Sequence, residues 1–453
     1  MLTHLEQFAQ DSARIALEDA AGTLTYKALW RQVQQTSIML QAAGVQRAAL
    51  DLPNDRAWVI AHLACLDAEI VQVPLPPFFT AQQREHALRD AGVDTVLVPS
   101  RDGNGLLRMD KKPYRSMPLP SGTALITYTS GSTGNPKGVC LSQAGMVQVT
   151  RSLLEVLGAD LARRHLSVLP LAVLLEQVGG LYAALLSGGT YVVRSEPLPQ
   201  ALALSQATSC ILVPELLKYL LQHKGPYPDL KFAAVGGARV DRTLIEAAQQ
   251  QGLPVYEGYG LSESASVVAV NTPQHHKPGT VGKILPHIHY HLAADGEMIL
   301  RDPAILGYTG GVQTQGEYAT GDLVAMDAQG YLTIHGRKKN QLITAYGRNV
   351  APEWPESLLT AQPEIAQAFV YGDAQASLSA LLVAGHEGAE IGEALARVNT
   401  QLPEYARIGQ WRRVPPFTAS NGMATGNGRL RREAILSTYA KDSNDGFLRP
   451  ACA

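Results

Sequence analysis

The chain has 453 residues, of which 46% are hydrophobic and 17% charged, and its formal net charge is −2. This length is typical of two or three globular domains, and the charge gives no electrostatic reason to expect nucleic acid or an acidic membrane surface as a partner. The cysteines are far apart and form no C-x-x-C pair, which predicts neither a zinc site nor a disulfide framework and favours a cytoplasmic location; they are Cys65, Cys140, Cys210 and Cys452.

The sequence predicts neither export nor a membrane span. The N-terminus, MLTHLEQFAQDSARIAL, has no basic stretch followed by an apolar run, which argues against a secretory signal. The most apolar segment, LSVLPLAVLLEQVGGLYAALL, is interrupted by Pro170, Glu176 and Gln177. We therefore interpret it as buried core.

Helical and strand patterns alternate through the first half of the chain. Residues 24–45 have the spacing of a helix, residues 57–77 change from a helical pattern to VQVPLPP, and residues 94–100 predict a strand. Short apolar runs then recur as TYVV, CILVP, KFAAVGG and PVYEGYG, each ending in Gly, Pro or a polar turn. Such runs are typical of buried strands, so the pattern predicts an α/β fold.

The pattern changes twice in the second half. From residue 279, GTVGKILPHIHYHLAADGEMILRD combines period-two alternation with an Asp-Gly turn, which predicts antiparallel β structure. From Gly336, GRKKNQLI is followed by the helix-like PEWPESLL, the strand-like AQAFVYG and SLSALLVAG, and the helix-like EIGEALARVNTQL. Roughly 115 residues suit a separate α+β lobe. We predict one domain over residues 1–336 and a mobile lobe over residues 337–453.

Residues 128–139, YTSGSTGNPKGV, contain four Ser or Thr residues, three glycines and one lysine. A Walker A loop does not fit, because Pro136 stands where its second glycine should be. The β-prone TALITY precedes the stretch and the helix-like LSQAGMVQVTRSLLEVLG follows it, so we expect the order strand, polar loop, helix. Bare glycine backbone and successive N–H groups suit an anion, so we predict a phosphate loop rather than a flexible Ser/Gly linker.

Four stretches in this order resemble the adenylate-forming acyl-activating family, the AMP-binding enzymes that include acyl-CoA synthetases, luciferases and peptide-synthetase adenylation domains. YTSGSTGNPKGV resembles the phosphate loop of that family, YGLSE at 259–263 its adenine motif, TGDL at 320–323 its ribose motif, and GRKKNQLI at 336–343 its hinge. VGKILPHIHYHLAADGEMILR and NGMATGNGRLRR are most similar to long-chain fatty acyl members. The resemblance implies a large N-terminal α/β domain with a distorted β-barrel subdomain, plus a small hinged C-terminal α+β lobe.

The resemblance also implies a reaction. A carboxylate attacks the α-phosphorus of ATP, giving an acyl-adenylate and pyrophosphate, and a thiol or amine then takes the acyl group. Lys137, Glu263 and Arg429 would be catalytic, and Glu263 would also be a Mg²⁺ ligand, since Mg²⁺ prefers carboxylate and phosphate oxygens. Lys339 would be the hinge residue, and Val173 would line the acyl pocket.

The nucleotide would be held by a larger set of residues. Tyr259 would stack on adenine, and Asp322 suits the ribose diol because one carboxylate can accept two O–H bonds. The full set implied by the resemblance is Thr129, Ser130, Gly131, Ser132, Thr133, Gly134, Gly237, Ala238, Tyr259, Gly260, Leu261, Ser262, Asp322 and Arg337.

Each assignment has a structural alternative. Taken alone, Asp322 would more often end a strand in a turn, and Glu263 would more often cap a helix or lie exposed. Because Asp322 and Glu263 occur in order with the other motifs, we prefer the functional assignment for both. The alternation in HIHYH could place three histidines on one face of a strand, as a metal site requires, but the stretch falls where the family has an ordinary strand, so we expect no metal at His287, His289 and His291.

Two positions depart from the family pattern. The family's C-terminal motif supplies a catalytic lysine, whereas NGMATGNGRLRR supplies Arg429, a planar fork in place of a mobile point charge, so we expect slower adenylation or an altered geometry. Long-chain members commonly read PLAH where this chain has Val173, which makes the wall of the acyl pocket apolar. No residue from Leu171 to Leu175 is acidic, which disfavours an amino-acid substrate and favours a fatty or aryl acid.

The acceptor stays open at this stage. Six arginines of the last lobe could meet the phosphates of coenzyme A or an acidic acyl carrier protein, or could form a solvated basic face; they are Arg407, Arg412, Arg413, Arg429, Arg431 and Arg432. The leading hypothesis is an ATP- and Mg²⁺-dependent ligase that transfers the acyl group to the thiol of CoA or a phosphopantetheine carrier. The alternatives are an amide-forming ligase and a nucleotide-binding scaffold without catalysis.

Overall fold

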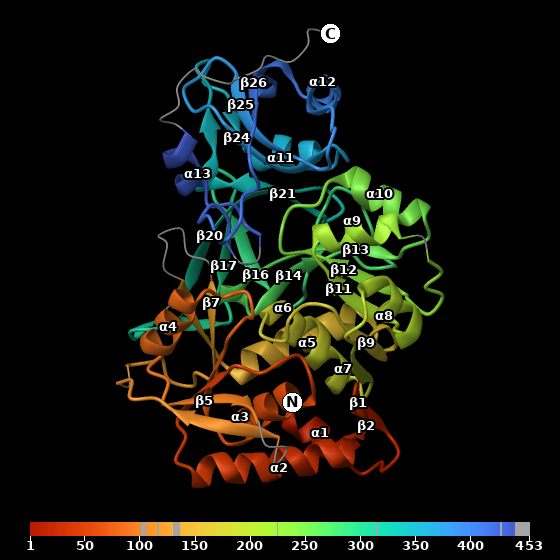
Figure 1. The fold of residues 1–453 in the computed structure, drawn as a ribbon, viewed down its shortest axis with the longest axis vertical. Coiled ribbons are helices and arrows are strands. Elements are labelled where there is room, and N and C mark those ends of the chain that lie inside the picture. Colours follow the sequence, from red (N-terminus) through yellow and green to blue (C-terminus); the bar gives the residue numbers. More distant parts are fainter. Residues whose placement is uncertain are drawn as a thin grey trace. The chain divides into compact units, whose positions relative to one another are not determined.

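The computed structural model describes residues 1–100, 106–115, 117–129, 136–223, 225–313, 316–425 and 428–439. The chain divides into two compact units (Figure 1). Unit 1 comprises Met1–Gly237, Ala247–His289 and Leu300–Tyr318, and unit 2 comprises Ala238–Glu246, Tyr290–Ile299 and Ala319–Ala453. The predicted boundary between residues 336 and 337 separates a domain from a lobe that we expect to move. It stays a prediction.

The first sheet of unit 1 has nine strands in the order β15-β14-β13-β12-β11-β9-β10-β1-β2. Its strands from β13 to β1 pair in parallel, and those at both edges pair antiparallel. The four short apolar runs fall on β10 to β13, as predicted. The strands are β1 (Ile15–Asp19), β2 (Gly22–Thr25), β9 (Arg164–Ser167), β10 (Thr190–Val193), β11 (Ser209–Leu212), β12 (Phe232–Val235), β13 (Val255–Leu261), β14 (Ser266–Val270) and β15 (Lys283–Ile284).

A second sheet of unit 1 has eight strands in the order β19-β18-β8-β7-β4-β3-β5-β6. Strands β3, β4, β5 and β7 pair in parallel, whereas the pairs made by β6, β8, β18 and β19 are antiparallel. The strands are β3 (Arg47–Leu50), β4 (Val71–Pro74), β5 (Thr95–Pro99), β6 (Leu107–Lys111), β7 (Leu125–Thr129), β8 (Lys137–Leu141), β18 (Ile305–Tyr308) and β19 (Val312–Gln313).

The expected order of strand, polar loop and helix is wrong in one respect. The strand β8 stands between the loop and the helix α5 (Gln143–Leu157), and β7 and β8 form an antiparallel pair from Leu125↔Leu141 to Thr129↔Lys137. The loop therefore closes a β-hairpin. KGVCL is long enough to pair along β7, and its last four residues are buried there. These residues therefore form a strand, and the helix begins only after them.

One hydrophobic core joins both sheets of unit 1 (Figure 1). Leu29 and Val33 of α2, Trp58 of α3 and Met146 of α5 pack in it together with residues of both sheets. The interrupted apolar segment is buried, as predicted, and includes a π-helix over Gln177–Tyr182. No helix among the described residues is long and apolar enough to cross a membrane. The helices of the first 250 residues are α1 (Leu2–Phe8), α2 (Tyr26–Ala42), α3 (Arg56–Asp67), α4 (Ala81–Asp90), α5 (Gln143–Leu157), α6 (Leu174–Glu176), α7 (Ala183–Leu186), α8 (Leu198–Ser205), α9 (Pro214–Gln222) and α10 (Arg242–Gln250).

A four-stranded sheet in the order β16-β17-β20-β21 provides the half-barrel. The Asp-Gly turn predicted from the sequence joins β16 to β17, with Gly296 at φ +84° and its N–H donating to the carbonyl of Ala293. The antiparallel interpretation of the stretch from residue 279 is confirmed for β15, which pairs antiparallel with β14. Strands β20 and β21 also pair antiparallel. The strands are β16 (His289–Leu292), β17 (Glu297–Arg301), β20 (Glu317–Met326) and β21 (Leu332–Arg337).

The C-terminal α+β lobe has the predicted elements together with the short strands β22 and β23, the strand β26 and the helix α13. A three-stranded sheet, β24-β25-β26, packs with the helices around its own core. The additional strand β26 pairs in parallel with β25. A two-residue pairing of β22 with β23 precedes this sheet. The elements are β22 (Leu342–Ile343), β23 (Asn349–Val350), α11 (Glu353–Thr360), β24 (Ile365–Tyr371), β25 (Leu378–Ala384), α12 (Ile391–Gln401), β26 (Ile408–Arg413) and α13 (Arg432–Tyr439).

Candidate active site

The base of the predicted phosphate loop is held by three elements of unit 1. The carboxylate of Asp90, the last residue of α4, accepts hydrogen bonds from Tyr128 at 2.8 Å and from Thr309 at 2.6 Å. The Thr309 N–H also donates to the carbonyl of Gly138 at 3.0 Å. These bonds tie the hairpin to the segment after β18. The loop residues Ser130, Gly131, Ser132, Thr133 and Gly134 lie outside the described part of the chain, whereas Thr129 and Lys137 are paired at its two ends.

Lys137 and Glu263 come from distant parts of the sequence and meet at one tyrosine. The ammonium of Lys137 lies 5.9 Å from the centre of the Tyr308 ring, within range of a cation–π interaction. The Tyr308 hydroxyl donates to Oε1 of Glu263 at 3.3 Å. The structure therefore brings together a cation and a carboxylate that the sequence analysis singled out as catalytic.

The turn that carries Glu263 has a tightly constrained backbone. Glu263 lies in a short 3₁₀ turn between β13 and β14, followed by Ala265 at φ 52° and Ser266 at φ 106°. A Cβ on Gly260 would lie 1.7 Å from the carbonyl oxygen of Ser266, so only glycine fits there. Left-handed non-glycine residues cost about 1–3 kcal/mol each and persist where the surroundings enforce them, often at functional sites.

The adenine motif and the preceding glycines lie at neighbouring strand ends. Strands β12 and β13 are parallel, and their last register pair is Val235 and Glu257. Gly237 and Tyr259 each follow two residues after that pair. Gly237 has φ +84°, which favours glycine. The carboxyl ends of parallel strands are where open α/β sheets bind ligands. Ala238 falls in unit 2, and Gly260, Leu261 and Ser262 continue from Tyr259 toward Glu263.

Within unit 2, Asp322 and Arg337 are register partners on β20 and β21. The Arg337 Nε lies 2.7 Å from Oδ1 of Asp322, and its Nη1 donates to the carbonyl of Thr320 at 3.0 Å. Asp322 is buried, with a relative exposure of 3%. A carboxylate offers about four lone-pair sites, so it can accept hydrogen bonds from more than one donor.

The predicted hinge is anchored within unit 2 on both sides of Lys339. Lys338 pairs with Asp295 at 2.6 Å and with Glu297 at 2.8 Å. Asn340 donates to Glu353 at 2.5 Å. Lys339 itself is exposed. Lys338 is exposed as well, so contacts on both sides hold the segment while its two lysines face solvent; the hinge role of Lys339 stays a prediction.

Arg429 lies at the end of a closed turn of the C-terminal lobe. The N–H of Thr425 donates to the carbonyl of Arg429 at 2.7 Å, and the N–H of Arg429 donates to Oγ1 of Thr425 at 2.9 Å. The Arg429 side chain is exposed. Helix α13 follows, and its first residue, Arg432, pairs with the half-buried Glu356 at 2.7 Å and lies over the ring of Phe369. Burial raises the pKa of Glu356 to about 7, although the charge of Arg432 opposes this shift.

The segment before Val173 is held by side chains that the sequence analysis missed. Asn54 donates to the carbonyl of Leu169 at 3.2 Å and accepts from the N–H of Leu171 at 2.9 Å. The buried carboxylate of Glu176 accepts from the N–H of Leu169 at 3.2 Å. Glu176 is supported by two further buried groups, His165 at 3.2 Å and Tyr191 at 2.8 Å. Glu176 was read only as an interruption of an apolar run, and a charged residue inside such a run is the signal that could have identified this network.

Apolar groups accompany Val173 in this part of unit 1. Val173 is half-buried, and its carbonyl begins the following helical turn by accepting from the N–H groups of Glu176 and Gln177. The side chain of Leu175 reaches to 3.9 Å from the position of a Cβ on Gly236, directly after β12. An apolar side chain of this segment thus lies near the carboxyl end of that strand.

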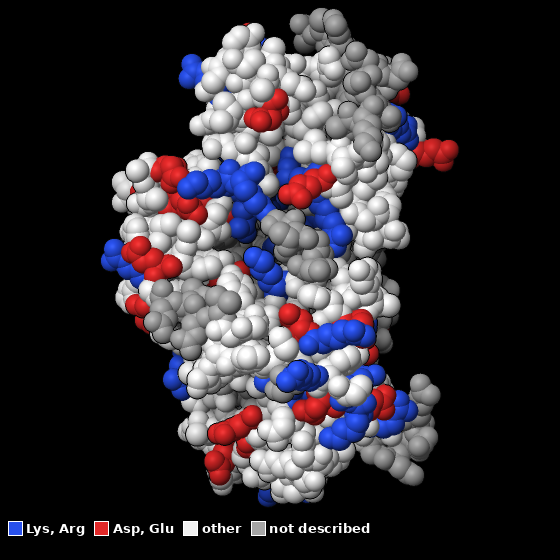
Figure 2. All heavy atoms as spheres, turned by 90° about the vertical axis from the view of Figure 1, so that its left-hand side faces the viewer, with Lys and Arg blue, Asp and Glu red and all other residues white. Residues whose placement is uncertain are grey.

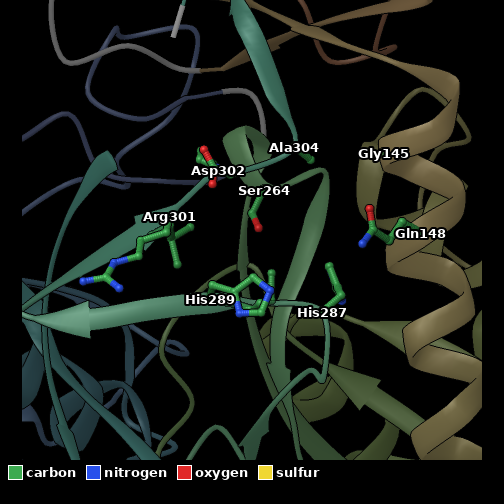
Figure 3. A pocket seen from close by; sticks show the side chains of 11 residues that line it. Gly145, Gln148, Ser264, His287, His289, Arg301, Asp302 and Ala304 are labelled. Carbon is green, nitrogen blue, oxygen red and sulfur yellow. The ribbon is translucent and has the colours of Figure 1, made fainter. Parts of the chain in front are cut away.

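A small pocket of about 70 Å³ lies behind the Glu263 turn. Figure 3 shows Ser264, His289 and Gln148 directed into it and Arg301 directed away. Buried polar atoms without a protein partner line it, namely Oγ of Ser264 and Nδ1 of His287. This size and polarity suit a few water molecules better than an acyl chain.

The described residues fit a substrate-borne Mg²⁺ better than a resident metal. No group of three His, Cys, Asp or Glu side chains that could hold a metal ion occurs in the described part of the chain, and this includes the HIHYH segment. Glu263 offers one half-exposed carboxylate next to a lysine. Mg²⁺ commonly binds one or two carboxylates together with substrate phosphates and waters, so this donor set is sufficient only when ATP is present.

Charge is mixed over the molecular face shown in Figure 2. Lys and Arg side chains stand beside Asp and Glu side chains over much of that face. This arrangement agrees with the net charge of −2 and gives that face no extended field of a single sign.

Comparison with known proteins identifies the family. The profile described as "AMP-binding enzyme" matches residues 5–307, and that described as "AMP-binding enzyme C-terminal domain" matches residues 339–447. The chain belongs to the AMP-binding, adenylate-forming enzyme family, and its fold has the large N-terminal domain, half-barrel and small C-terminal domain expected from the sequence.

Similar proteins include acid–CoA ligases and an amide synthetase. Long-chain-fatty-acid–CoA ligase FadD15 of Mycobacterium tuberculosis is 34% identical over 244 residues, which are 46% of this chain and only 41% of that ligase. The structure of o-succinylbenzoate CoA synthetase (MenE) from Bacillus subtilis has a TM-score of 0.83 at 24% identity and covers 98% of this chain and 99% of that one. Amide bond synthetase McbA from Marinactinospora thermotolerans has a TM-score of 0.79 at 23% identity, over 97% and 99% of the two chains.

Proposed function

We propose that this chain is an ATP-dependent carboxylate ligase that activates a fatty or aryl acid as an acyl-adenylate and transfers the acyl group to the thiol of CoA or a phosphopantetheine carrier. The observation that carries the proposal is the convergence of Lys137 and Glu263 on Tyr308 at the base of the YTSGSTGNPKGV hairpin. A scaffold that only bound nucleotide would not require this paired cation and carboxylate. The Bacillus subtilis synthetase has been solved with ATP and magnesium ion and with the acyl-adenylate OSB-AMP, which supports the same ligands here.

In the first half-reaction, a carboxylate oxygen of the acid attacks the α-phosphorus of ATP, and the bond to the bridging oxygen breaks to release pyrophosphate. The protein's task is positioning and neutralisation of charge. Lys137 and the backbone of the hairpin would hold the phosphates, and Asp322 would hold the ribose. Mg²⁺, when bound with ATP at Glu263, would neutralise phosphate charge. In the second half-reaction, the thiol sulfur attacks the acyl carbonyl carbon, loses its proton, and AMP leaves.

The substrate proposal rests on the wall around Val173. An amino-acid ammonium would need a buried carboxylate, and Glu176 already accepts hydrogen bonds from a backbone N–H and from Tyr191. The half-buried Val173 and the position of Leu175 near Gly236 favour an apolar acyl group instead.

One observation in the C-terminal lobe supports the alternative hypothesis of an amide-forming ligase. Of the six arginines expected to meet CoA or a carrier protein, Arg432 forms an internal ion pair and Arg407 donates to the carbonyl of Leu402. The basic surface for a phosphorylated acceptor is therefore smaller than the sequence suggests. Acceptor screening with CoA, a carrier protein and simple amines separates the two ligases.

The first test is acid-dependent exchange of pyrophosphate into ATP over a panel of fatty and aryl acids. We expect exchange with at least one apolar acid. Lys137→Ala should lower that exchange by about 100-fold or more, as expected on loss of a charge-stabilising group, and should leave the melting temperature unchanged because Lys137 is exposed. Lys27→Ala, on the surface of α2, is the control. Exchange that is absent with every acid, or equal in Lys137→Ala, would contradict the proposal.

A further inference from the structure

Two tyrosines outside the four motifs lie against Glu263 in unit 1. Tyr308 is the last residue of β18, and its hydroxyl donates to Oε1 of Glu263 at 3.3 Å. Tyr318, on β20, has its hydroxyl 3.5 Å from that of Tyr308. Both tyrosines are half-buried. The two phenols therefore form a chain of contacts that ends at the Glu263 carboxylate.

Tyr308 also contacts the cation of the site. The Lys137 ammonium lies 5.9 Å from its ring centre, so one side chain meets Lys137 with its face and Glu263 with its hydroxyl. The backbone fixes this placement, because Tyr308 is the register partner of Val139 on β8, two residues beyond Lys137. The neighbouring Thr309 is bonded to Asp90. The backbone that carries this ring is thus fixed by its pairing with β8 and by the hydrogen bond of the next residue.

Building on the adenylation function proposed above, we propose that Tyr308 and Tyr318 are positioning residues for Glu263. The Tyr308 hydroxyl, backed by the hydroxyl of Tyr318, engages Oε1 of the carboxylate and so leaves Oε2 for the Mg²⁺ that accompanies ATP. The ring face of Tyr308 holds the Lys137 ammonium at the same tyrosine.

The physical basis is the flexibility of a glutamate at a half-exposed turn. Its side chain has three rotatable bonds, and ordering it when the cation binds would oppose binding. Hydrogen bonds to a ligating carboxylate remove that freedom in advance and commonly contribute substantially to metal affinity. Burial raises the pKa of both phenols above the ordinary value, so they remain neutral hydrogen-bond donors at neutral pH.

The test compares Tyr308→Phe, Tyr318→Phe and the double variant with Tyr114→Phe. The control removes a phenol–glutamate hydrogen bond of the same kind, from Tyr114 to Glu85 at 2.8 Å, between residues that take no part in the proposal. The probe is Mn²⁺, titrated by electron paramagnetic resonance with a non-hydrolysable ATP analogue. We expect the Mn²⁺ dissociation constant to rise roughly 10-fold for Tyr308→Phe. The effect of the double variant should be smaller than the product of the single effects, because both phenols act on one carboxylate.

Three readouts separate positioning from a general structural role. Binding of the nucleotide analogue in a chelator and the melting temperature should stay as in the unsubstituted protein, and raised Mg²⁺ should restore exchange activity in the variants. Unchanged Mn²⁺ affinity in the folded double variant would overturn the proposal, as would no Mn²⁺ binding by the unsubstituted protein. Because the Mn²⁺ titration needs no acid substrate, absence of exchange with every acid would count against the ligase function without deciding the role of the tyrosines.

Discussion

At the scale of single residues, Asp322 differs most from its sequence-based description. The ribose assignment considered an isolated carboxylate, whereas the buried Asp322 is already paired with Arg337. Removing the whole side chain would leave the guanidinium without this partner, so an alanine variant would confound binding with stability. Asn keeps the shape and removes the charge, which makes it the sharper substitution.

We expect Asp322→Asn to weaken nucleotide binding and to spare the acid. Hydrogen bonds to a charged group contribute about 1.5–3 kcal/mol, so the nucleotide dissociation constant should rise roughly 10- to 100-fold. Calorimetric titration with nucleotide and with the best acid provides the measurement. Asp110→Asn, which alters a strand ion pair with Arg108 of 2.9 Å, is the control. Equal losses of nucleotide and acid affinity would count against the ribose role.

At the scale of elements, the first residue of α13 forms a half-buried ion pair. Glu356 of α11 accepts from Arg432 and from the N–H of Val370, both at 2.7 Å. Loss of hydration nevertheless raises the pKa of Glu356 to about 7 from its usual value of 4.5. Between these values the folded chain binds the proton more tightly than the unfolded chain, so the contribution of Glu356 to stability falls as pH rises from about 4.5 to about 7.

Glu356→Gln should remove this pH dependence. At about 1.4 kcal/mol per pKa unit, the loss of stability across that window is at most about 3 kcal/mol. The measurement is the melting temperature of the full chain at pH 5 and at pH 8. The difference between these two melting temperatures should shrink in Glu356→Gln, and Glu364→Gln, at the exposed pair with Arg397, should leave it unchanged. An undiminished difference in Glu356→Gln would show that Glu356 does not titrate in this range.

At the scale of the whole molecule, the family resemblance predicts that one lobe serves two half-reactions by rotating about Lys339. Arg429→Ala should then slow adenylation by roughly 100-fold but spare transfer from a supplied acyl-adenylate, and Arg429→Lys should preserve or raise adenylation by restoring a compact ammonium. Lys339→Pro should do the reverse, because a fixed φ at the pivot restricts rotation.

Both half-reactions are measured separately for these variants. Arg397→Ala, which removes the exposed pair with Glu364 in the same lobe, is the matched control. If Arg429→Ala impairs both steps equally, or neither, the two-position mechanism does not apply to this chain.

Local patterns in the sequence were sufficient for the class of fold and for the motifs that nominate the residues of the site. Apolar runs such as TYVV and CILVP predict buried strands because short continuous apolar runs suit strands covered on both faces, and both runs lie in the parallel sheet. The motifs that contain Lys137, Glu263 and Asp322 could be recognised without a structure because each is a short contiguous stretch. Two helices and two strands of the α+β lobe after Gly336 were likewise predicted.

The tertiary structure alone decided which of these residues meet. Lys137 and Glu263 are far apart in sequence and share Tyr308 only in the folded chain. The pairing of Asp322 with Arg337, and the hydrogen bond from the N–H of Leu169 to Glu176, likewise depend on how the chain folds. The β7–β8 hairpin was missed because pairing of KGVCL with LITYT depends on a partner strand rather than on local periodicity. In the sequence, Glu176 only interrupts an apolar run. In the folded chain its carboxylate is buried, and because a buried carboxylate needs hydrogen-bond donors, it binds the N–H of Leu169 and so holds that segment.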